Sequence, residues 1–211
     1  MRIYLADLGH NQLTLSSDVF PLGVANLAMY VREYATNGGS FDIQLFREPE
    51  DLKAALDAEV PDVLGLSSYS WNHELSCQMA RHAKALRPDV LTLMGGPNFP
   101  LDRKSQESHL RATPEIDVGV RGPTYEGERA FLNIVERFDA VGRRLEGIFE
   151  EPVPGNLWID PKSDEFVVGG NVDRILDLDD IPSPYLSGFL DPYFETGYFP
   201  LMQIARGCPF S

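Results

Sequence analysis

Short apolar runs alternate with stretches of helical periodicity from residue 2 to about residue 138, and this alternation constrains the fold most. Each run is short and rich in apolar side chains. The strand-like runs are residues 2–8, 41–46, 62–68, 90–96 and 116–122. Strands that alternate with helices in this way pair in parallel. The sequence therefore predicts an α/β fold with a five-stranded, doubly wound parallel sheet of the flavodoxin-like or Rossmann-like type.

The segments between these runs carry the spacing of amphipathic helices. The first predicted helix has an apolar face of Phe20, Val24, Leu27, Ala28 and Val31. The second predicted helix covers residues 49–59. The fourth, residues 101–114, is polar and more weakly predicted. The third is capped by Asn72, and its predicted apolar face is Leu75, Met79, Ala83 and Leu86. The fifth has Phe131, Ile134, Val135 and Phe138 on one face.

The pattern changes after Asp139, where two β-like runs flank a turn at residues 160–165. These runs predict a hairpin appended to the sheet. Residues 177–194 are rich in Asp and Pro, so we expect an extended connector there. Residues 199–207 are again strand-like and lead into Cys208. We divide the chain into an α/β domain (1–138), a hairpin extension (139–176), and a connector with the first strand of a further domain (177–211).

The chain is acidic, with 18 basic and 32 acidic side chains and a formal net charge of −14. Such a charge repels phosphate backbones and anionic lipid, so a nucleic-acid or membrane partner would need a local basic patch and neither is expected. No apolar stretch reaches the ~20 residues of a bilayer span. Cys77 and Cys208 make no disulfide framework. We expect a cytoplasmic protein with reduced thiols.

Four parts of the chain carry a family pattern. They are PLGVANLAMYVRE (21–33), PDVLGLSSYSWN (61–72), MGGPNFP (94–100), and LDLDDIPSPYL (176–186) with FPLMQIARGCPFS (199–211). These parts are spread between residues 21 and 211, so the resemblance extends along nearly all of the chain. The chain thereby resembles the N-terminal cobalamin-binding domain and linker of the cobalamin-dependent radical S-adenosylmethionine enzymes.

The resemblance implies an iron–sulfur role for Cys208 as a metal ligand. In that family the motif continues as C-x-x-x-C-x-x-C, whose three thiolates hold a [4Fe–4S] cluster and leave one iron open for S-adenosylmethionine. Cys208 matches the first ligand, and the other two would follow residue 211. We expect no cluster on the 211-residue chain by itself.

The expected cofactor site follows from topology, because ligands of open parallel sheets bind outside the carboxyl ends of the strands. Four loops lie there: residues 8–11, 67–72, 95–99 and 121–127. Small residues would let the cobalamin tail approach the backbone and would supply hydroxyl donors. Each alone is more readily explained as a turn residue, and it is their joint placement that favours a ligand. The candidate cofactor-binding residues are Leu8, Gly9, Gly65, Ser67, Ser68, Tyr69, Trp71, Gly95, Gly96, Pro97, Asn98, Gly122, Glu126, Gly127 and Glu128.

Two details of these loops bear on the cofactor. Tyr69, Trp71 and Phe99 are candidates to shelter the corrin face from water. The resemblance implies a Gly-Glu-Gly-Glu run touching the tail, whereas here RGPTYEGE inserts residues 123–125 between Gly122 and the EGE of residues 126–128.

Histidine placement bears on the cobalt ligand. The methionine-synthase type of domain uses D-x-H-x-x-G, but here His10 stands three places after Asp7 and Leu13 replaces the glycine. We therefore predict base-off cobalamin without a histidine ligand, as the resemblance implies. His73, His82 and His109 are expected to be solvated or capping side chains.

Three functions remain open at this point. The resemblance implies an enzyme that, in its complete form, methylates a small-molecule substrate from methylcobalamin and receives electrons from a reductant protein. A radical cyclase with the same domain order is the second reading. The third is a non-catalytic binding module, although no G-x-G-x-x-G follows the first strand. No hydrolytic triad is present, so we expect no catalysis by the fragment alone.

Overall fold

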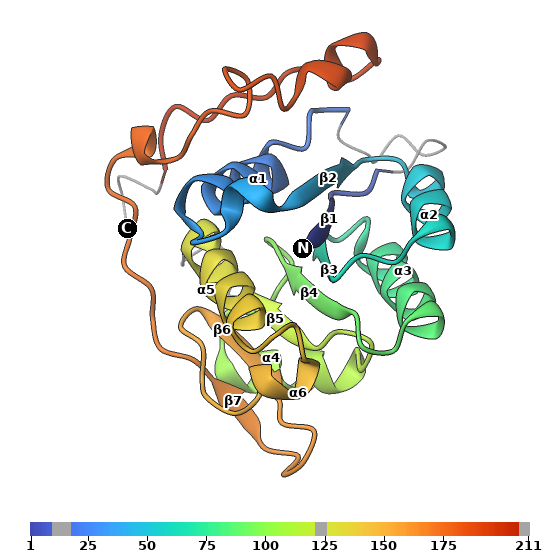
Figure 1. The fold of residues 1–211 in the computed structure, drawn as a ribbon, viewed down its shortest axis with the longest axis vertical. Helices are drawn as coiled ribbons and strands as arrows, with labels where there is room; N and C mark the ends of the chain where they lie inside the picture. The colour runs from blue at the N-terminus through green and yellow to red at the C-terminus, as the bar shows by residue number, and fades with distance from the viewer. Residues whose placement is uncertain (10–17, 121–125, 207–211) are drawn as a thin grey trace.

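The computed structural model describes residues 1–9, 18–120 and 126–206, and within them seven strands form one sheet in the order β2-β1-β3-β4-β5-β6-β7 (Figure 1). The strands are β1 (Arg2–Ala6), β2 (Asp42–Phe46), β3 (Val63–Ser67), β4 (Leu91–Gly95), β5 (Val118–Val120), β6 (Asn156–Ile159) and β7 (Phe166–Val168). The first five are parallel, and β6 and β7 are antiparallel to their neighbours. The predicted doubly wound sheet with an appended hairpin is confirmed.

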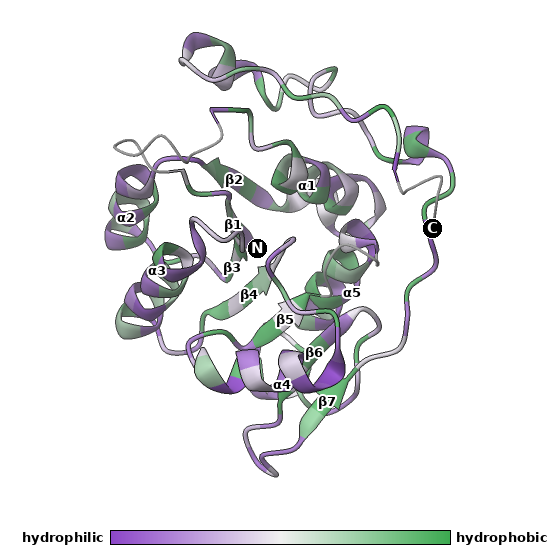
Figure 2. Cartoon of the chain, turned by 180° about the vertical axis from the view of Figure 1, so that it is seen from behind, coloured by the Kyte–Doolittle hydropathy of each residue, from purple (hydrophilic) through white to green (hydrophobic). Residues whose placement is uncertain are grey.

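Helices cover both faces of the sheet. On one face lie α1 (Leu22–Tyr34), α5 (Gly127–Ala140) and the short α6 (Leu145–Ile148). On the other lie α2 (Pro49–Ala58), α3 (His73–Leu86) and α4 (Arg103–Ala112). Alternate residues of β1 enter the two cores: Ile3 and Leu5 face α1, and Tyr4 and Ala6 face α2 and α3. The buried strands are accordingly mostly apolar, as Figure 2 shows for β4 to β6, although Thr92 in β4 and Asn156 in β6 are buried polar residues.

Two helix predictions have different outcomes. The predicted face of α5 is confirmed, because all four of its residues are at most 1% exposed. On α3 the face is rotated. The residues turned to the sheet are Ser76, Cys77, Ala80 and Ala83, whereas Leu86 is 49% exposed. Small side chains bring α3 close to the sheet, and this close packing leaves the longer Leu75 and Met79 at the margin of the core.

The hairpin extends the sheet beyond β5. β6 pairs antiparallel with β5 and with β7, and its Leu157 and Trp158 are fully buried on opposite faces. The turn between β6 and β7 is closed by Asp160 Oδ1, which accepts hydrogen bonds from the backbone N–H groups of Lys162 (2.7 Å) and Ser163 (2.9 Å).

The structure continues the connector without a strand to the last described residue, so from here on the connector means residues 177–206. It packs against α1 (Figure 1). It contains the 3₁₀ turns Leu178–Asp180 and Asp191–Glu195. Ile181 packs beside Tyr30, and Leu190 beside Phe20. The strand predicted at residues 199–207 was wrong for its described part: Phe199 makes a single parallel bridge with Val19, and residues 200–206 form no strand. A strand needs a continuous pairing partner, and only that one bridge supplies it here.

No helix within the described parts of the chain is both long enough and apolar enough to cross a bilayer.

Candidate functional site

The carboxyl ends of β1, β3 and β4 meet at one edge of the sheet. The chain leaves β1 through Leu8 and Gly9, and β3 and β4 through residues 68–72 and 96–98. Strand order reverses between β1 and β3, which is where doubly wound sheets bind ligands. We call this set of loops, residues 8–9, 67–72 and 95–98, the cofactor edge. Residues 10, 11 and 121–125 of the predicted loops, including His10 and Gly122, lie outside the described residues.

Asn72 ties the β1 and β3 loops together. Its Nδ2 donates to the backbone oxygen of Leu8 (3.0 Å) and to Ser67 Oγ (3.0 Å), and its Oδ1 accepts from the backbone N–H of Tyr69 (2.7 Å). Asn72 precedes α3 as predicted, but its side chain does not cap the helix. The buried amide instead fixes the width of the cofactor edge.

A buried ion pair lies beneath the same loops. Arg47 Nη1 donates to the backbone oxygen of Asp7 (2.5 Å) and lies 3.4 Å from its carboxylate, which also accepts from Ser67 Oγ (2.7 Å). Burial raises the pKa of the Asp7 carboxyl, while Arg47 and the Ser67 hydrogen bond oppose that rise. A Cβ on Gly9 would lie 3.4 Å from the Arg47 guanidinium carbon. The sequence analysis did not identify Arg47 as a site residue. The feature that could have indicated it is a basic residue directly after an apolar strand.

The β3 and β4 loops are in direct backbone contact. The Ser68 N–H donates to Gly95 O (2.6 Å), and the Asn98 N–H donates to Ser68 O (3.0 Å). Gly96 has φ +113°, and a Cβ there would lie 2.9 Å from Ser68 O. Its position therefore requires glycine. Pro97 and Asn98 stand exposed beside it.

Gly65 has a different setting within β3. A Cβ there would lie 2.6 Å from Leu5 Cδ2 and 3.7 Å from Phe131. Gly65 thus allows close packing inside the sheet layer, whereas Gly95 and Gly96 are partly exposed at the cofactor edge.

The three predicted aromatic residues separate into two groups. Tyr69 and Trp71 stack at the cofactor edge with ring centroids 4.6 Å apart and planes 12° apart, and both are half-buried. Phe99 is 1% exposed and packs into the core, where Gly119 leaves room for its ring. The proposal that Phe99 shelters a ligand is therefore wrong.

The described histidines are engaged within the protein. His73 Nδ1 lies 3.0 Å from Ser68 Oγ, and its Nε2 lies 3.8 Å from Cys77 Sγ. His82 Nε2 lies 2.6 Å from Asp57 Oδ1. His109 packs on Phe99 and His73, and burial lowers its pKa. Their description as solvated or capping side chains was thus wrong for His73 and His109.

The EGE run lies at the amino end of α5. Glu126 and Glu128 are each 5% exposed, and their carboxylates accept hydrogen bonds from Arg206. Gly127 faces α1, where its Cβ would lie 3.6 Å from Leu27. Cys208 lies outside the described residues. Contact of these residues with a cofactor tail stays a prediction.

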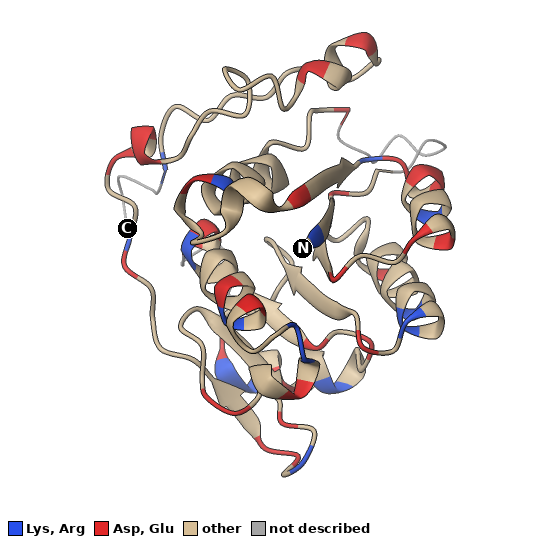
Figure 3. Cartoon of the chain, in the orientation of Figure 1, with Lys and Arg blue, Asp and Glu red and all other residues tan. Residues whose placement is uncertain are grey.

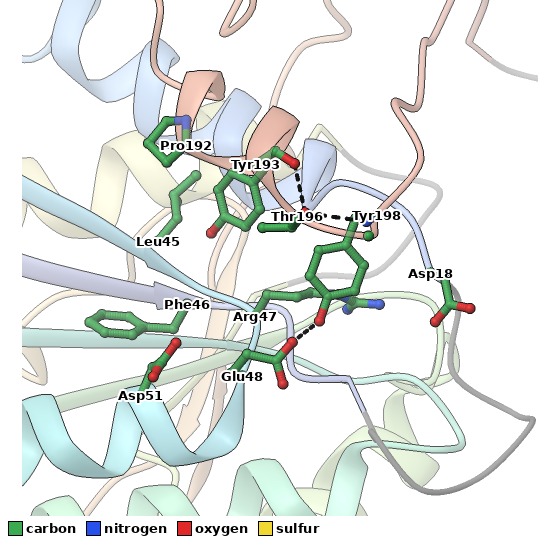
Figure 4. A pocket seen from close by; sticks show the side chains of 11 residues that line it. Asp18, Leu45, Phe46, Arg47, Glu48, Asp51, Pro192, Tyr193, Thr196 and Tyr198 are labelled. Atoms are coloured by element: carbon green, nitrogen blue, oxygen red, sulfur yellow. Dashed lines mark hydrogen bonds between the residues drawn. The ribbon is translucent and has the colours of Figure 1, made fainter.

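A cavity of about 530 Å³ opens at the carboxyl end of β2, beneath the connector (Figure 4). Tyr193 and Tyr198 of the connector and Arg47 and Glu48 after β2 contribute to its lining. The Tyr198 hydroxyl donates to Glu48, and burial raises the pKa of Tyr193 to about 12. No sequence motif indicated this cavity, because it forms between segments about 150 residues apart.

Comparison with known proteins gives the family. The sequence model of the B12 binding domain matches residues 12–135. The chain is 32% identical to the cobalamin-dependent radical SAM methyltransferase TokK of Streptomyces tokunonensis over 204 residues, which is 90% of this chain and 27% of TokK. It is 31% identical to the 2-(S-pantetheinyl)-carbapenam-3-carboxylate methyltransferase of Streptantibioticus cattleyicolor over 206 residues. This alignment covers 90% of this chain and 27% of that methyltransferase.

A solved structure shares the fold. The cobalamin-dependent S-adenosylmethionine radical enzyme OxsB with aqua-cobalamin bound matches with a TM-score of 0.62 and 17% identity, over 89% of this chain and 24% of OxsB. The chain spans about a quarter of the length of these relatives. The aligned part of this chain is similar to the corresponding part of the two methyltransferases named above. From the match over residues 12–135, the chain belongs to the B12-binding domain family.

Proposed function

We propose that the chain seats cobalamin on the cofactor edge as the cobalamin-binding part of a longer radical S-adenosylmethionine methyltransferase. The observation that carries the proposal is the meeting of three small-residue loops at the switch point of the sheet, in a chain of the B12-binding family. Methyl transfer is favoured over ring closure because the two relatives above are named as methyltransferases.

The residues present fit a broad, flat ring with a tail. Residues 95–98 offer exposed or partly exposed backbone, and a side chain at Gly96 would close the approach beside Ser68. The stacked Tyr69 and Trp71 supply an apolar wall that excludes water. Asn72 and the Asp7–Arg47 pair hold the loops at a fixed separation.

We also propose that cobalamin is held base-off without a histidine ligand. In support, both ring nitrogens of His73, which follows Asn72 directly, already have partners in the protein. When bound, cobalamin supplies a transferable methyl group. The chain's own residues bind and orient it and contribute no described catalytic group.

The remaining machinery belongs to the longer protein. We propose that Cys208 is the first of three thiolates for a [4Fe–4S] cluster that binds S-adenosylmethionine, with the other two supplied by sequence after residue 211. A small-molecule substrate and a reductant protein complete the reaction. The 211-residue chain by itself then binds cobalamin without catalysis.

Titration of the chain with hydroxocobalamin, followed by its visible bands, tests the site. We expect one equivalent to bind. Asn98→Trp should weaken binding at least about tenfold, because an indole at this exposed position would occupy the space of the ring. The substitution also removes the 3.4 Å hydrogen bond from Asn98 Nδ2 to Ser68 Oγ, so melting temperatures are compared as well.

The matched control is Lys162→Trp. Lys162 is also exposed but lies in the β6–β7 turn, at the opposite edge of the sheet because β6 runs antiparallel to β5. Equal affinities of the two variants, at equal melting temperatures, would contradict the placement of cobalamin on the cofactor edge.

A further inference from the structure

Arg206 reaches from the end of the connector to the amino end of α5. Its Nη1 donates to Glu126 Oε2 (2.6 Å) and Glu128 Oε2 (3.0 Å), and its Nη2 donates to Glu128 Oε1 (2.8 Å). Nη2 also donates to Gln203 Oε1 (3.0 Å). The guanidinium therefore holds Glu128 in a two-pronged pair and Glu126 by a third bond. We call this arrangement the Arg206 clamp.

The Arg206 clamp neutralises the negative charge of two buried carboxylates, which would be unfavourable without a nearby cation. Glu126 and Glu128 are two carboxylates only two positions apart, each 5% exposed. The amino end of a helix favours negative charge, but two buried like charges repel each other. The planar, forked guanidinium of arginine has enough N–H donors to bind both carboxylates at once. The single ammonium group of lysine lacks this geometry.

The connector is fixed at other points before it reaches the clamp. The Tyr34 hydroxyl donates to Asp180 O (2.8 Å), and the Arg32 guanidinium stacks 4.2 Å from the Phe189 ring centroid. Nearer the clamp, the Tyr185 hydroxyl donates to Leu201 O (2.6 Å) and accepts from the Leu201 N–H (3.0 Å).

Residues 202–206 have fewer restraints. Met202 and Ile204 are 76% and 88% exposed. The position of this stretch therefore depends strongly on Arg206, whose two glutamates lie 78 and 80 positions away in the sequence.

We propose that Arg206 is a positioning residue, which clamps the segment leading to Cys208 onto the amino end of α5. In sequence Arg206 precedes Cys208 by two positions, and α5 follows the loop that leaves β5 at the carboxyl edge of the sheet. The clamp thus holds residue 206, two positions before Cys208 in the sequence, at the amino end of α5. In the proposed function Cys208 is the first cluster ligand. This inference rests on the proposed function, and it gives the EGE run a role besides contact with the cofactor tail.

Hydrogen exchange of the chain, followed by mass spectrometry of its peptides, tests the clamp. In Arg206→Gln we expect peptides covering residues 199–206 to exchange about tenfold faster, because three charge-assisted bonds are lost. Arg206→Lys should restore part of the protection, since it keeps the charge but not the fork. Glu128→Gln should resemble Arg206→Gln.

Arg174→Gln is the matched control. Arg174 also approaches Glu126, but at 3.8 Å and with a side chain 65% exposed, so its loss should leave exchange unchanged. Exchange in β3 and β4 should stay at wild-type values in all four variants. The affinity for hydroxocobalamin should stay at the wild-type value in the three arginine variants, none of which changes a candidate cofactor-binding residue.

Two failures can be told apart. Unchanged exchange of residues 199–206 in Arg206→Gln, or faster exchange spread over the whole sheet, would overturn the clamp as a local positioning device. A wild-type chain that takes up no hydroxocobalamin would overturn the proposed function instead. If Arg206→Gln does not fold, Arg206→Lys and Glu128→Gln carry the same test with milder changes.

Discussion

Asn72 is the single side chain on which the geometry of the cofactor edge depends most. It is fully buried, and both ends of its amide are used to join Leu8, Ser67 and Tyr69. Removal of this buried amide would break all three bonds, and Ser67 Oγ would keep only its bond to Asp7. Rigid loops of this kind reduce the ordering that a ligand would otherwise have to impose on binding.

Cys77 is expected to be chemically inert in the folded chain. It is 1% exposed, and burial, followed by the nearby Glu115, raises the pKa of its thiol to about 12. Since the thiolate is the nucleophile, its fraction at pH 8 falls about a thousandfold or more below that of a free cysteine. In a Cys208→Ser chain, iodoacetamide at pH 8 should label Cys77 only after unfolding.

The pH dependence gives a further check on Cys77. In the folded Cys208→Ser chain, the rate at which Cys77 is labelled should stay low through neutral pH. It should rise only as the pH approaches 12 or as the protein unfolds. Rapid labelling of native chain at pH 8, at a rate independent of urea below the unfolding transition, would contradict the burial of α3 against the sheet.

At the scale of elements, the connector behaves as part of the domain. Leu190 is fully buried against Phe20, Leu22 and Ala25, so the connector covers apolar surface of α1 and the segment before it. Figure 3 shows that Asp and Glu residues occur along α2, α5 and the connector. The connector is therefore held mainly by apolar packing and by specific pairs such as the Arg206 clamp.

Leu190→Ala should lower the free energy of unfolding by about 2–4 kcal/mol, because it removes buried methyl groups and leaves a cavity beneath the connector. Leu186→Ala is the control: Leu186 is 93% exposed, so its loss should change the free energy by less than about 0.5 kcal/mol. Urea unfolding measures both. Equal effects would show that the connector does not dock on α1.

The elements that could be predicted are those in which the spacing of apolar residues in the sequence matches the face that is buried in the structure. The five parallel strands, the appended hairpin and the apolar face of α5 follow from local patterns of residues. The face of α3 could not be predicted, because the sheet receives its small residues rather than its large ones. The predicted strand at 199–207 failed because strand formation depends on a partner, which sequence propensity does not report.

At the scale of the whole molecule, topology located the cofactor edge but not its internal contacts. The carboxyl ends of parallel strands must meet, so Gly9, Ser67 and Gly96 could be grouped from sequence. The Arg47–Asp7 pair and the Arg206 clamp join segments 40 and about 80 residues apart. No local spacing encodes such contacts, and Phe99 was misplaced because its cavity is created by Gly119 on another strand.

The most direct test of the account is a crystal structure of the chain grown with hydroxocobalamin. We expect the corrin ring to lie over residues 8–9, 67–72 and 95–98, beside the stacked Tyr69 and Trp71, with no histidine nitrogen on cobalt. A ring seated in the cavity beneath the connector, or cobalt bound by His73, would contradict it.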